Sequence, residues 1–198
     1  RKRPSLLLLH FVDLDAVAHE HGPFEKEAKQ TLEQTDRYIA EIIAAAPAGT
    51  VFAIVGDHGF ERVDREINVT RLGRDLSLGG EARSFGGLLL ALSEEAGRKL
   101  RATGLMGREV PPAELMQFAP ELGAWKVAVA FEPKRHEGFV AAGADESLVL
   151  APHEKGNHGW WPGLSDYRAA FLLWGPGVRR GATPVLRLED AAFRFAAI

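Results

Sequence analysis

Residues 50–60 read TVFAIVGDHGF, a short β-branched apolar run followed at once by an acidic and an imidazole side chain between two glycines. A run of this kind, bounded by turn residues, is typical of a strand buried inside a parallel sheet. Glycines on either side of Asp57 and His58 allow another backbone to approach closely. The segment predicts a strand over 50–55 whose carboxyl end carries two candidate metal ligands.

The segments before this run predict the rest of a strand–helix–strand unit. Residues 5–12 (SLLLLHFV) predict a first buried strand, and apolar residues at helical spacing over 22–46 predict a helix of about six turns that ends at Pro47. Such a unit is a right-handed crossover, which puts the carboxyl ends of both strands on one edge of the sheet. We therefore expect ligands to bind at that edge.

Later segments predict further strands and an inserted subdomain. Residues 87–145 are punctuated by Pro and Gly and poor in metal-ligand candidates, so we expect a small α+β cap there, with a strand over 125–131. The metal-binding core would then comprise 1–86 and 146–198.

Within the second part of that core, YRAAFLLWGPG (167–177) predicts a strand, and a terminal helix is expected from Leu188 onward. The expected fold class is α/β, with a mostly parallel central sheet flanked by helices and a small α+β cap.

Composition excludes several classes of protein and of partner. The chain has 198 residues, 46% of them hydrophobic, with 24 basic and 27 acidic side chains and no cysteine. A globular core is expected, and disordered, collagenous and disulfide-stapled classes are excluded. The basic residues are scattered, so no nucleic-acid polymer is expected as a partner, and the apolar run at 6–9 is too short for a membrane span.

The chain starts at Arg1 rather than Met, and a strand-like run begins at once at Ser5. We therefore expect a fragment of a longer protein. Absence of cysteine suits either redox setting, and the compartment and the oligomeric state stay open.

Five side chains are candidate metal ligands. Asp15 and His19 are four residues apart, which places both on one face of a helix, and Asp57 and His58 follow the strand over 50–55. His158 lies in a Gly-flanked loop, GNHGWWPG, before the last predicted strand. We expect all five to converge at one sheet edge.

The donor types favour particular metals. Mixed imidazole and carboxylate ligands suit zinc best, with manganese or iron as alternatives, whereas an all-oxygen set would favour magnesium or calcium. Five ligands are too many for one tetrahedral site and one short of two sites with three protein ligands each. A two-metal site that lacks one ligand is the natural interpretation, and a pair of cations suits an anionic phosphate-ester substrate.

Three motifs, in this order, carry a family resemblance: DLDAVAHEHGP (13–23), VGDHGF (55–60) and GNHGW (156–160). The chain resembles the alkaline phosphatase superfamily, and most closely its type I phosphodiesterase/nucleotide pyrophosphatase family. DREINVTRLGR (64–74) and FLLWGPGV (171–178) are also similar to that family, while 87–145 is the least typical stretch.

The resemblance implies an alkaline-phosphatase-like fold and assigns the ligands. One divalent metal would be held by Asp15, His19 and His158, and the other by Asp57 and His58. Two zinc ions are implied, with manganese as the alternative.

The chain departs from the family pattern in one respect. Family members hold the second metal with a further Asp near the amino terminus and attack with a Thr or Ser that opens a helix after it. Both would lie upstream of Arg1, and Ser5 only begins a predicted strand, so no nucleophile is assigned.

The resemblance implies hydrolysis of phosphate esters, above all phosphodiester or nucleotide pyrophosphate bonds. The hydroxyl would attack phosphorus, and water would then hydrolyse the covalent enzyme ester. Monoesters, phosphonates and sulfates stay open as substrates. The alternative is a non-catalytic, metal-binding remnant with a structural or partner-dependent role.

The remaining aromatic residues and histidines carry weaker expectations. Trp160 is a candidate substrate contact, and His153 a candidate contact to substrate or metal. His10 is expected in the core or lining a cleft, His21 in solvent or in indirect contact with the site, and His136 in solvent.

Overall fold

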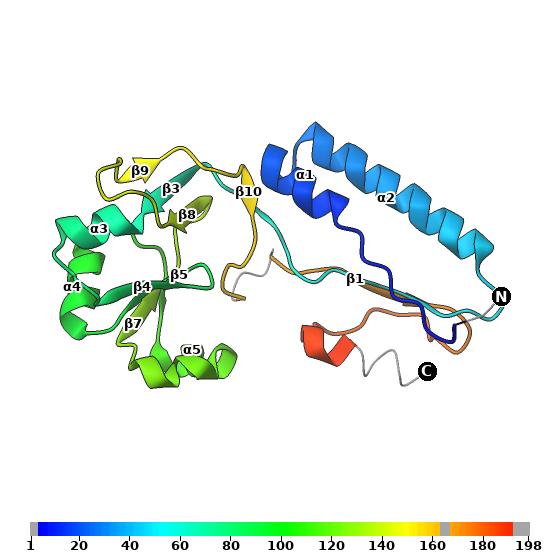
Figure 1. The fold of residues 1–198 in the computed structure, drawn as a ribbon. Helices are drawn as coiled ribbons and strands as arrows, with labels where there is room; N and C mark the ends of the chain where they lie inside the picture. The colour runs from blue at the N-terminus through cyan, green and yellow to red at the C-terminus, as the bar shows by residue number, and fades with distance from the viewer. Residues whose placement is uncertain (1–3, 163–166, 192–198) are drawn as a thin grey trace.

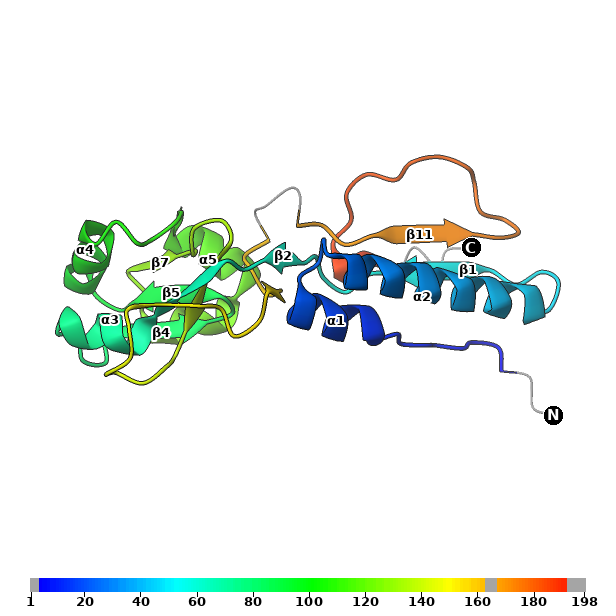
Figure 2. The same cartoon turned by 90° about the horizontal axis from the view of Figure 1, so that it is seen from above.

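The computed structural model describes residues 4–162 and 167–191, which form two lobes (Figure 1). We call residues 63–151 the packed lobe, and residues 4–60 with 167–191 the open lobe. Strands β2 (Glu61–Arg62) and β10 (Gly156–Asn157) pair antiparallel with each other. Seen from above, β2 runs between the two lobes, so this short ladder joins them (Figure 2).

The packed lobe contains two sheets. The first has the order β4-β5-β7-β6 and is antiparallel throughout: β4 (Ala82–Phe85), β5 (Leu88–Ala91), β7 (Val129–Phe131) and β6 (Glu109–Val110). The second has the order β8-β3-β9: β8 (Glu137–Val140), β3 (Arg65–Asn68) and β9 (Val149–Leu150). The helices are α3 (Val69–Asp75), α4 (Glu94–Ala102), α5 (Pro112–Phe118) and the 3-10 helix η1 (Pro120–Trp125).

Strand β5 explains why this lobe is well packed. Leu89 and Ala91 belong to one hydrophobic cluster, and Leu88 and Leu90 belong to another. Because successive side chains of a strand point to opposite faces, β5 contributes to two apolar layers at once. All four residues are at most 2% exposed.

Side-chain caps fix two helix starts in the packed lobe. The Oδ1 atom of Asn68 accepts hydrogen bonds from the backbone N–H groups of Thr70 and Arg71, both at 3.1 Å, at the start of α3. The Oγ atom of Ser93 accepts from the N–H of Ala96 at 3.2 Å at the start of α4. Each satisfies backbone donors that a helix start leaves unpaired.

The open lobe consists of α1 (Asp13–His21), α2 (Lys26–Ala45), β1 (Phe52–Val55), β11 (Phe171–Trp174) and the 3-10 helix η2 (Leu188–Asp190). Strands β1 and β11 pair antiparallel, and the rings of Phe52 and Trp174 stack at 5.2 Å. Within the described part of this lobe, Ala18 and Ala28 are the only buried apolar residues. None of the described helices has the length and apolar character that crossing a membrane requires.

The prediction of a buried strand over 5–12 is wrong. The segment has no strand structure, and Leu6 to Leu9 are 55–83% exposed. His10 is exposed as well, rather than in the core or a cleft. A strand forms only where a partner takes up its backbone hydrogen bonds, and none of the strands described in 4–162 and 167–191 pairs with this segment.

The prediction of a mostly parallel central sheet is also wrong. The sheets are small, and among the described strands β3 and β8 form the only parallel pair. Because residues 5–12 form no strand, the expected parallel crossover is not made, and β1 pairs instead with β11. The mixed α/β character of the fold is confirmed.

Several predicted elements are confirmed in place. The helix over 22–46 is α2, the strand over 50–55 is β1, and β11 lies within 167–177. The strand predicted over 125–131 begins only at Val129, because η1 occupies the preceding residues and Lys126 follows it with φ +51°. Where the terminal helix is expected, the structure has the 3-10 turn η2, and residues 192–198 of that prediction lie outside the described residues.

The division into a core and an inserted cap stays a prediction. In the structure β4 pairs with β5 across residue 86, and β3 pairs with both β8 and β9. Residues on both sides of each expected boundary thus share sheets.

Candidate metal centre

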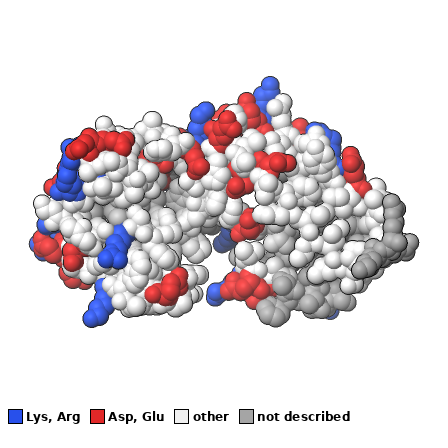
Figure 3. Space-filling model, in the orientation of Figure 1, with Lys and Arg blue, Asp and Glu red and all other residues white. Residues whose placement is uncertain are grey.

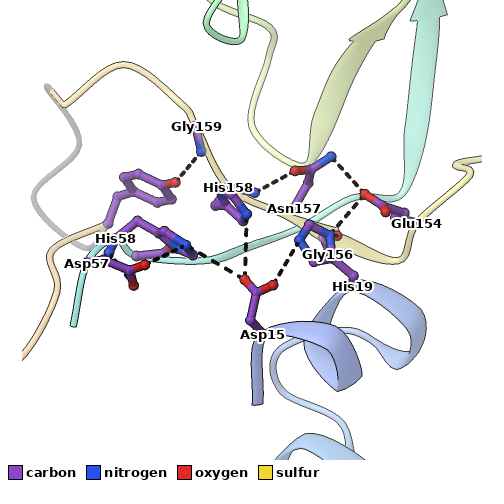
Figure 4. A network of polar contacts seen from close by, with 11 residues as sticks. Asp15, His19, Asp57, His58, Glu154, Gly156, Asn157, His158 and Gly159 are labelled. Carbon is purple, nitrogen blue, oxygen red and sulfur yellow. Dashed lines mark hydrogen bonds and ion pairs between the residues drawn. The ribbon is translucent and has the colours of Figure 1, made fainter. Parts of the chain in front are cut away.

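The five predicted ligands come from three segments that meet where the lobes join (Figure 4). Asp15 and His19 lie on α1, Asp57 and His58 follow β1, and His158 follows β10. Packing of α1 against β10 brings the first and last of these segments together, since Lys155 N–H donates to the carbonyl of His19 at 2.9 Å.

Asp15 lies at the centre of the group. Its Oδ1 is 3.5 Å from Nε2 of His158 and 3.7 Å from Nε2 of His58, and its Oδ2 is 3.7 Å from Nε2 of His19. The rings of His58 and His158 stack at 3.7 Å between centroids. Three imidazoles therefore present the same ring atom to one carboxylate.

Hydrogen bonds at the far side of two rings fix this orientation. Nδ1 of His19 donates to the carbonyl of Gly156 at 3.0 Å and also lies 2.9 Å from Oε2 of Glu154 as an ion-pair contact, and Nδ1 of His58 donates to the carbonyl of Gly59 at 3.0 Å. These partners are acceptors, so the network assigns a proton to each Nδ1 and leaves each Nε2 lone pair free.

The third ring, that of His158, has a shifted pKa. Burial, followed by the charge of His58, lowers the pKa of His158 below its ordinary value. A neutral imidazole keeps the lone pair that binding of a metal requires.

The residues present fit a divalent metal. Oδ1 of Asp15 is buried and accepts no hydrogen bond, although a buried carboxylate oxygen is expected to have a partner. One ligand atom each from Asp15, His19 and His158 lie within 4.8 Å of one another. The separations of 3.5 and 3.7 Å from Asp15 resemble those of about 3.3–3.6 Å between two ligands of one tetrahedral zinc ion.

Asp57 lies beside this triad and is more exposed. Its Oδ2 is 3.6 Å from Nε2 of His58, and its side chain is 67% exposed. Its Oδ1 accepts a hydrogen bond from the N–H of His58 at 3.1 Å. Asp57 and His58 thus offer two ligand atoms on the side of Asp15 away from His19, as Figure 4 shows.

Three further residues contact the site and were not predicted from the sequence: Glu154, Asn157 and Tyr167. The Tyr167 hydroxyl accepts from the N–H of Gly159 at 2.6 Å, and burial raises the pKa of this phenol. A Cβ at Gly59 would lie 2.2 Å from the carbonyl oxygen of Tyr167, which explains the glycine after His58. The glycines were visible in the sequence, but what they approach was not.

The two candidate substrate contacts, Trp160 and His153, lie in different surroundings. Trp160 lines a cleft of about 400 Å³ with Glu61, Lys134 and His136, among others, and its ring lies edge-on to Tyr167 at 6.2 Å. His153 pairs with Glu66, with Nδ1 and Oε2 2.6 Å apart. Contact of either residue with substrate stays a prediction.

His21 lies where the sequence predicted it, near the surface, whereas His136 does not. His21 is near the surface, with Nε2 3.7 Å from Oε2 of Glu20. His136 is not simply solvated, because its Nδ1 is buried 3.2 Å from Oε2 of Glu61. Pairing with a buried carboxylate, which the sequence does not reveal, explains the difference.

Solved structures match this fold over most of the chain. Phosphonoacetate hydrolase from Sinorhizobium meliloti 1021, in complex with phosphonoformate, matches with a TM-score of 0.62 and 19% identity over 92% of this chain and 49% of its own. Human ectonucleotide pyrophosphatase/phosphodiesterase 5 matches with a TM-score of 0.59 and 16% identity over 92% of this chain and 50% of its own. These likenesses establish an alkaline-phosphatase-like fold, and the chain spans about half the length of either protein.

Among curated proteins, the catalytic subunit of GPI ethanolamine phosphate transferase 3 from Mus musculus is 35% identical over 55 residues, which are 28% of this chain and 5% of that protein. The sequence model of the family described as type I phosphodiesterase / nucleotide pyrophosphatase matches residues 1–134. The match covers more than half of the chain and four of the five predicted ligand positions, and so the chain belongs to the type I phosphodiesterase/nucleotide pyrophosphatase family of the alkaline phosphatase superfamily.

Proposed function

We propose that this chain carries the metal-binding residues of a metal-dependent hydrolase of phosphate esters, with phosphodiester or nucleotide pyrophosphate bonds as substrates. One observation carries the proposal: three imidazole Nε2 atoms from separate segments surround Asp15, whose Oδ1 is buried without a hydrogen bond. Phosphate-ester substrates are typical of the family.

Two groups of residues would hold the metals. Asp15, His19 and His158 would bind one divalent cation, and Asp57 with His58 would contribute to a second. Zinc suits this donor set, and manganese is the alternative. When bound, the two cations supply positive charge and Lewis acidity at the reacting phosphate.

Contacts within the chain orient the ligand side chains of this site without a metal. The carbonyl acceptors at Nδ1 of His19 and His58 place a proton on Nδ1 and leave Nε2 as the ligand atom, and burial lowers the pKa of His158, which favours its neutral form. The stacked rings of His58 and His158 hold the two groups of ligands next to each other. Little reorganisation is then needed on binding, which favours a defined coordination geometry.

The cleft beside Trp160 would hold the organic part of the ester. Trp160 follows His158 by two residues, and Glu61 follows His58 by three, so both lining residues lie close to the ligands along the chain. An indole face suits an aromatic or other flat group. The nucleophile, a Thr or Ser hydroxyl by family resemblance, is not assigned to a residue of this chain.

Turnover tests the proposal. The product of the complete reading frame and the 198-residue chain would each be assayed with bis(4-nitrophenyl) phosphate, with and without zinc. We expect zinc-dependent hydrolysis by the former, lost in His158→Ala, and near-background rates for the latter. A zinc-loaded full product that cleaves no phosphate ester would contradict the proposal and favour the non-catalytic, metal-binding role.

A further inference from the structure

Glu154 makes the closest polar contact to any of the three imidazoles. Its Oε2 lies 2.9 Å from Nδ1 of His19, a residue 135 positions earlier in the chain. The Glu154 side chain is 46% exposed, whereas that of His19 is 19% exposed. Core packing therefore does not account for the position of the Glu154 carboxylate.

The backbone around Glu154 is held on both sides. Lys155 donates its N–H to the carbonyl of His19 at 2.9 Å, and its own carbonyl accepts from the N–H of Val63 at 3.0 Å. The next two residues form β10, paired with β2. Glu154 thus lies next to α1 because the residues that follow it are hydrogen-bonded to α1 and to β2, the strand that leads into the packed lobe.

Asn157 connects Glu154 to another of the ligand segments. Its Nδ2 donates to Oε2 of Glu154 at 3.1 Å, and its Oδ1 accepts from the N–H of His158 at 2.7 Å. Figure 4 shows this continuous path from His19 through Glu154 and Asn157 to the backbone of His158. Two of the three triad residues are therefore oriented by one pair of side chains.

We infer that Glu154 is a positioning residue for the metal centre: its carboxylate, 2.9 Å from Nδ1 of His19, acts together with the carbonyl of Gly156 to keep Nδ1 protonated, turns Nε2 toward the metal and makes that nitrogen a better donor. The inference rests on the proposed function, since it assumes that the triad binds metal. A carboxylate on the far nitrogen of a ligating imidazole fixes its tautomer and raises its basicity, and loss of such a contact lowers metal affinity about 10- to 100-fold.

Zinc titration of three variants of the 198-residue chain tests the inference. Glu154→Ala removes the carboxylate, Glu154→Gln keeps its shape but not its charge, and Glu20→Gln is the matched control. Glu20 neighbours His19 on α1, yet its Oε2 contacts His21 rather than His19. We expect zinc affinity to fall about 10- to 100-fold in Glu154→Ala and by a smaller factor in Glu154→Gln, and to be unchanged in Glu20→Gln.

A spectroscopic readout without metal separates positioning from a general effect of charge. Long-range 1H–15N NMR spectra, recorded where the imidazole is neutral, should show His19 of the parent chain with a protonated Nδ1 and a bare Nε2, and a larger share of the other tautomer in Glu154→Ala, where only the Gly156 carbonyl remains at Nδ1. Loss of affinity together with this change supports the inference. An unchanged affinity, or an unchanged tautomer whatever the affinity, overturns it.

Failure of the proposed function can be distinguished from failure of the positioning role of Glu154. If the parent chain and Glu20→Gln bind no zinc, the proposed function fails, while the tautomer of metal-free His19 still reports on Glu154. If both bind zinc and Glu154→Ala binds it equally well, only the positioning role fails.

Discussion

A similar apolar sequence is exposed in the open lobe and buried in the packed lobe. Residues 6–9 (LLLL) and 88–91 (LLLA) are both wholly apolar, yet the former are 55–83% exposed and the latter at most 2% exposed. In the packed lobe β5 lies between β4 and β7, while in the open lobe no described strand pairs with residues 5–12. Burial of an apolar run thus depends on partners on both sides rather than on the run itself.

The candidate metal centre lies where these two lobes meet, and its residues come from both sides of the junction. Four of its five predicted ligands belong to the open lobe, whose described part buries few apolar side chains. His158 and Glu154 come from the segment beyond the packed lobe, where the buried indole of Trp161 donates to Oε1 of Glu114 at 2.7 Å. We infer that the packed lobe holds the second half of the site in place. The predictions below test this contrast.

The largest expected effect concerns the packed core. Phe131→Ala removes a side chain that is 0% exposed, and should lower the free energy of unfolding by about 3–5 kcal/mol. Phe24→Ala, in the open lobe, removes a ring that is 76% exposed and should change it by about 0.5 kcal/mol or less. Urea unfolding followed by circular dichroism measures both. Equal losses would contradict the contrast between the lobes.

The next effect concerns the contact of α1, in the open lobe, with β10, in the ladder that joins the lobes. A Cβ at Gly156 would lie 2.5 Å from the carbonyl oxygen of Ala18, so Gly156→Ala must push β10 away from α1. Overpacking of this kind is expected to destabilise by about 1–3 kcal/mol, and zinc affinity should fall as His158 moves from His19. Differential scanning fluorimetry with and without zinc measures the two effects.

Gly73→Ala is the matched control for that variant. Gly73 lies in α3 of the packed lobe, and a Cβ there would meet no atom within 4 Å. Alanine in a helix is favoured by about 0.5–1 kcal/mol over glycine, so a small gain in stability is expected with unchanged zinc binding. Loss of zinc binding in Gly73→Ala would show that the site responds to any change in the packed lobe.

A smaller effect should appear at low pH. The hydrogen bond from Arg108 lowers the pKa of Glu114 below 4.5, and the Trp161 indole adds to this. The ionised form therefore stabilises the fold fully above pH 4.5, and this contribution is lost as the pH falls through the lower, folded-state pKa. Because the Arg108 side chain is 44% exposed, solvent screening limits the contribution to about 0.2–1 kcal/mol.

Unfolding of Glu114→Gln between pH 6 and 3 measures this contribution. The variant should lose less stability than the parent chain as the pH falls. Glu20→Gln, with a side chain that is 76% exposed in the open lobe, should follow the parent chain. A Glu114→Gln curve parallel to that of the parent would contradict the role given to the Arg108–Glu114 pair.

Local patterns predicted the individual elements better than their partners. The helical spacing over 22–46 and the β-branched run at 50–55 each produce the expected element, because both signals are local. The direction of the sheet was not predictable in this way. Pairing of β1 with β11 joins residues more than 100 positions apart, and nothing local in TVFAIV specifies that partner.

In the candidate site, too, residues with a local sequence signal were predicted, and residues that depend on long-range pairing were not. The candidate ligands are recognisable in the sequence from residue type and spacing: Asp15 lies four residues before His19, and Asp57 precedes His58 directly. His158 is recognisable from the glycines on either side of it. Glu154 carries no such signal, since it reaches His19 only through the pairing of β10 with β2. Charge patterns are no better guide, because acidic and basic side chains are interspersed on the face shown in Figure 3, which is hollowed between the lobes.

Zinc titration of the 198-residue chain by calorimetry tests the central claim most directly, that Asp15, His19 and His158 form a metal site. We predict one tighter binding event, weakened at least roughly 100-fold by His158→Ala and unchanged by His10→Ala, which removes an exposed imidazole of the open lobe. The site built from Asp57 and His58 should bind a second ion only weakly. Equal zinc affinity of the parent chain and His158→Ala would contradict the account.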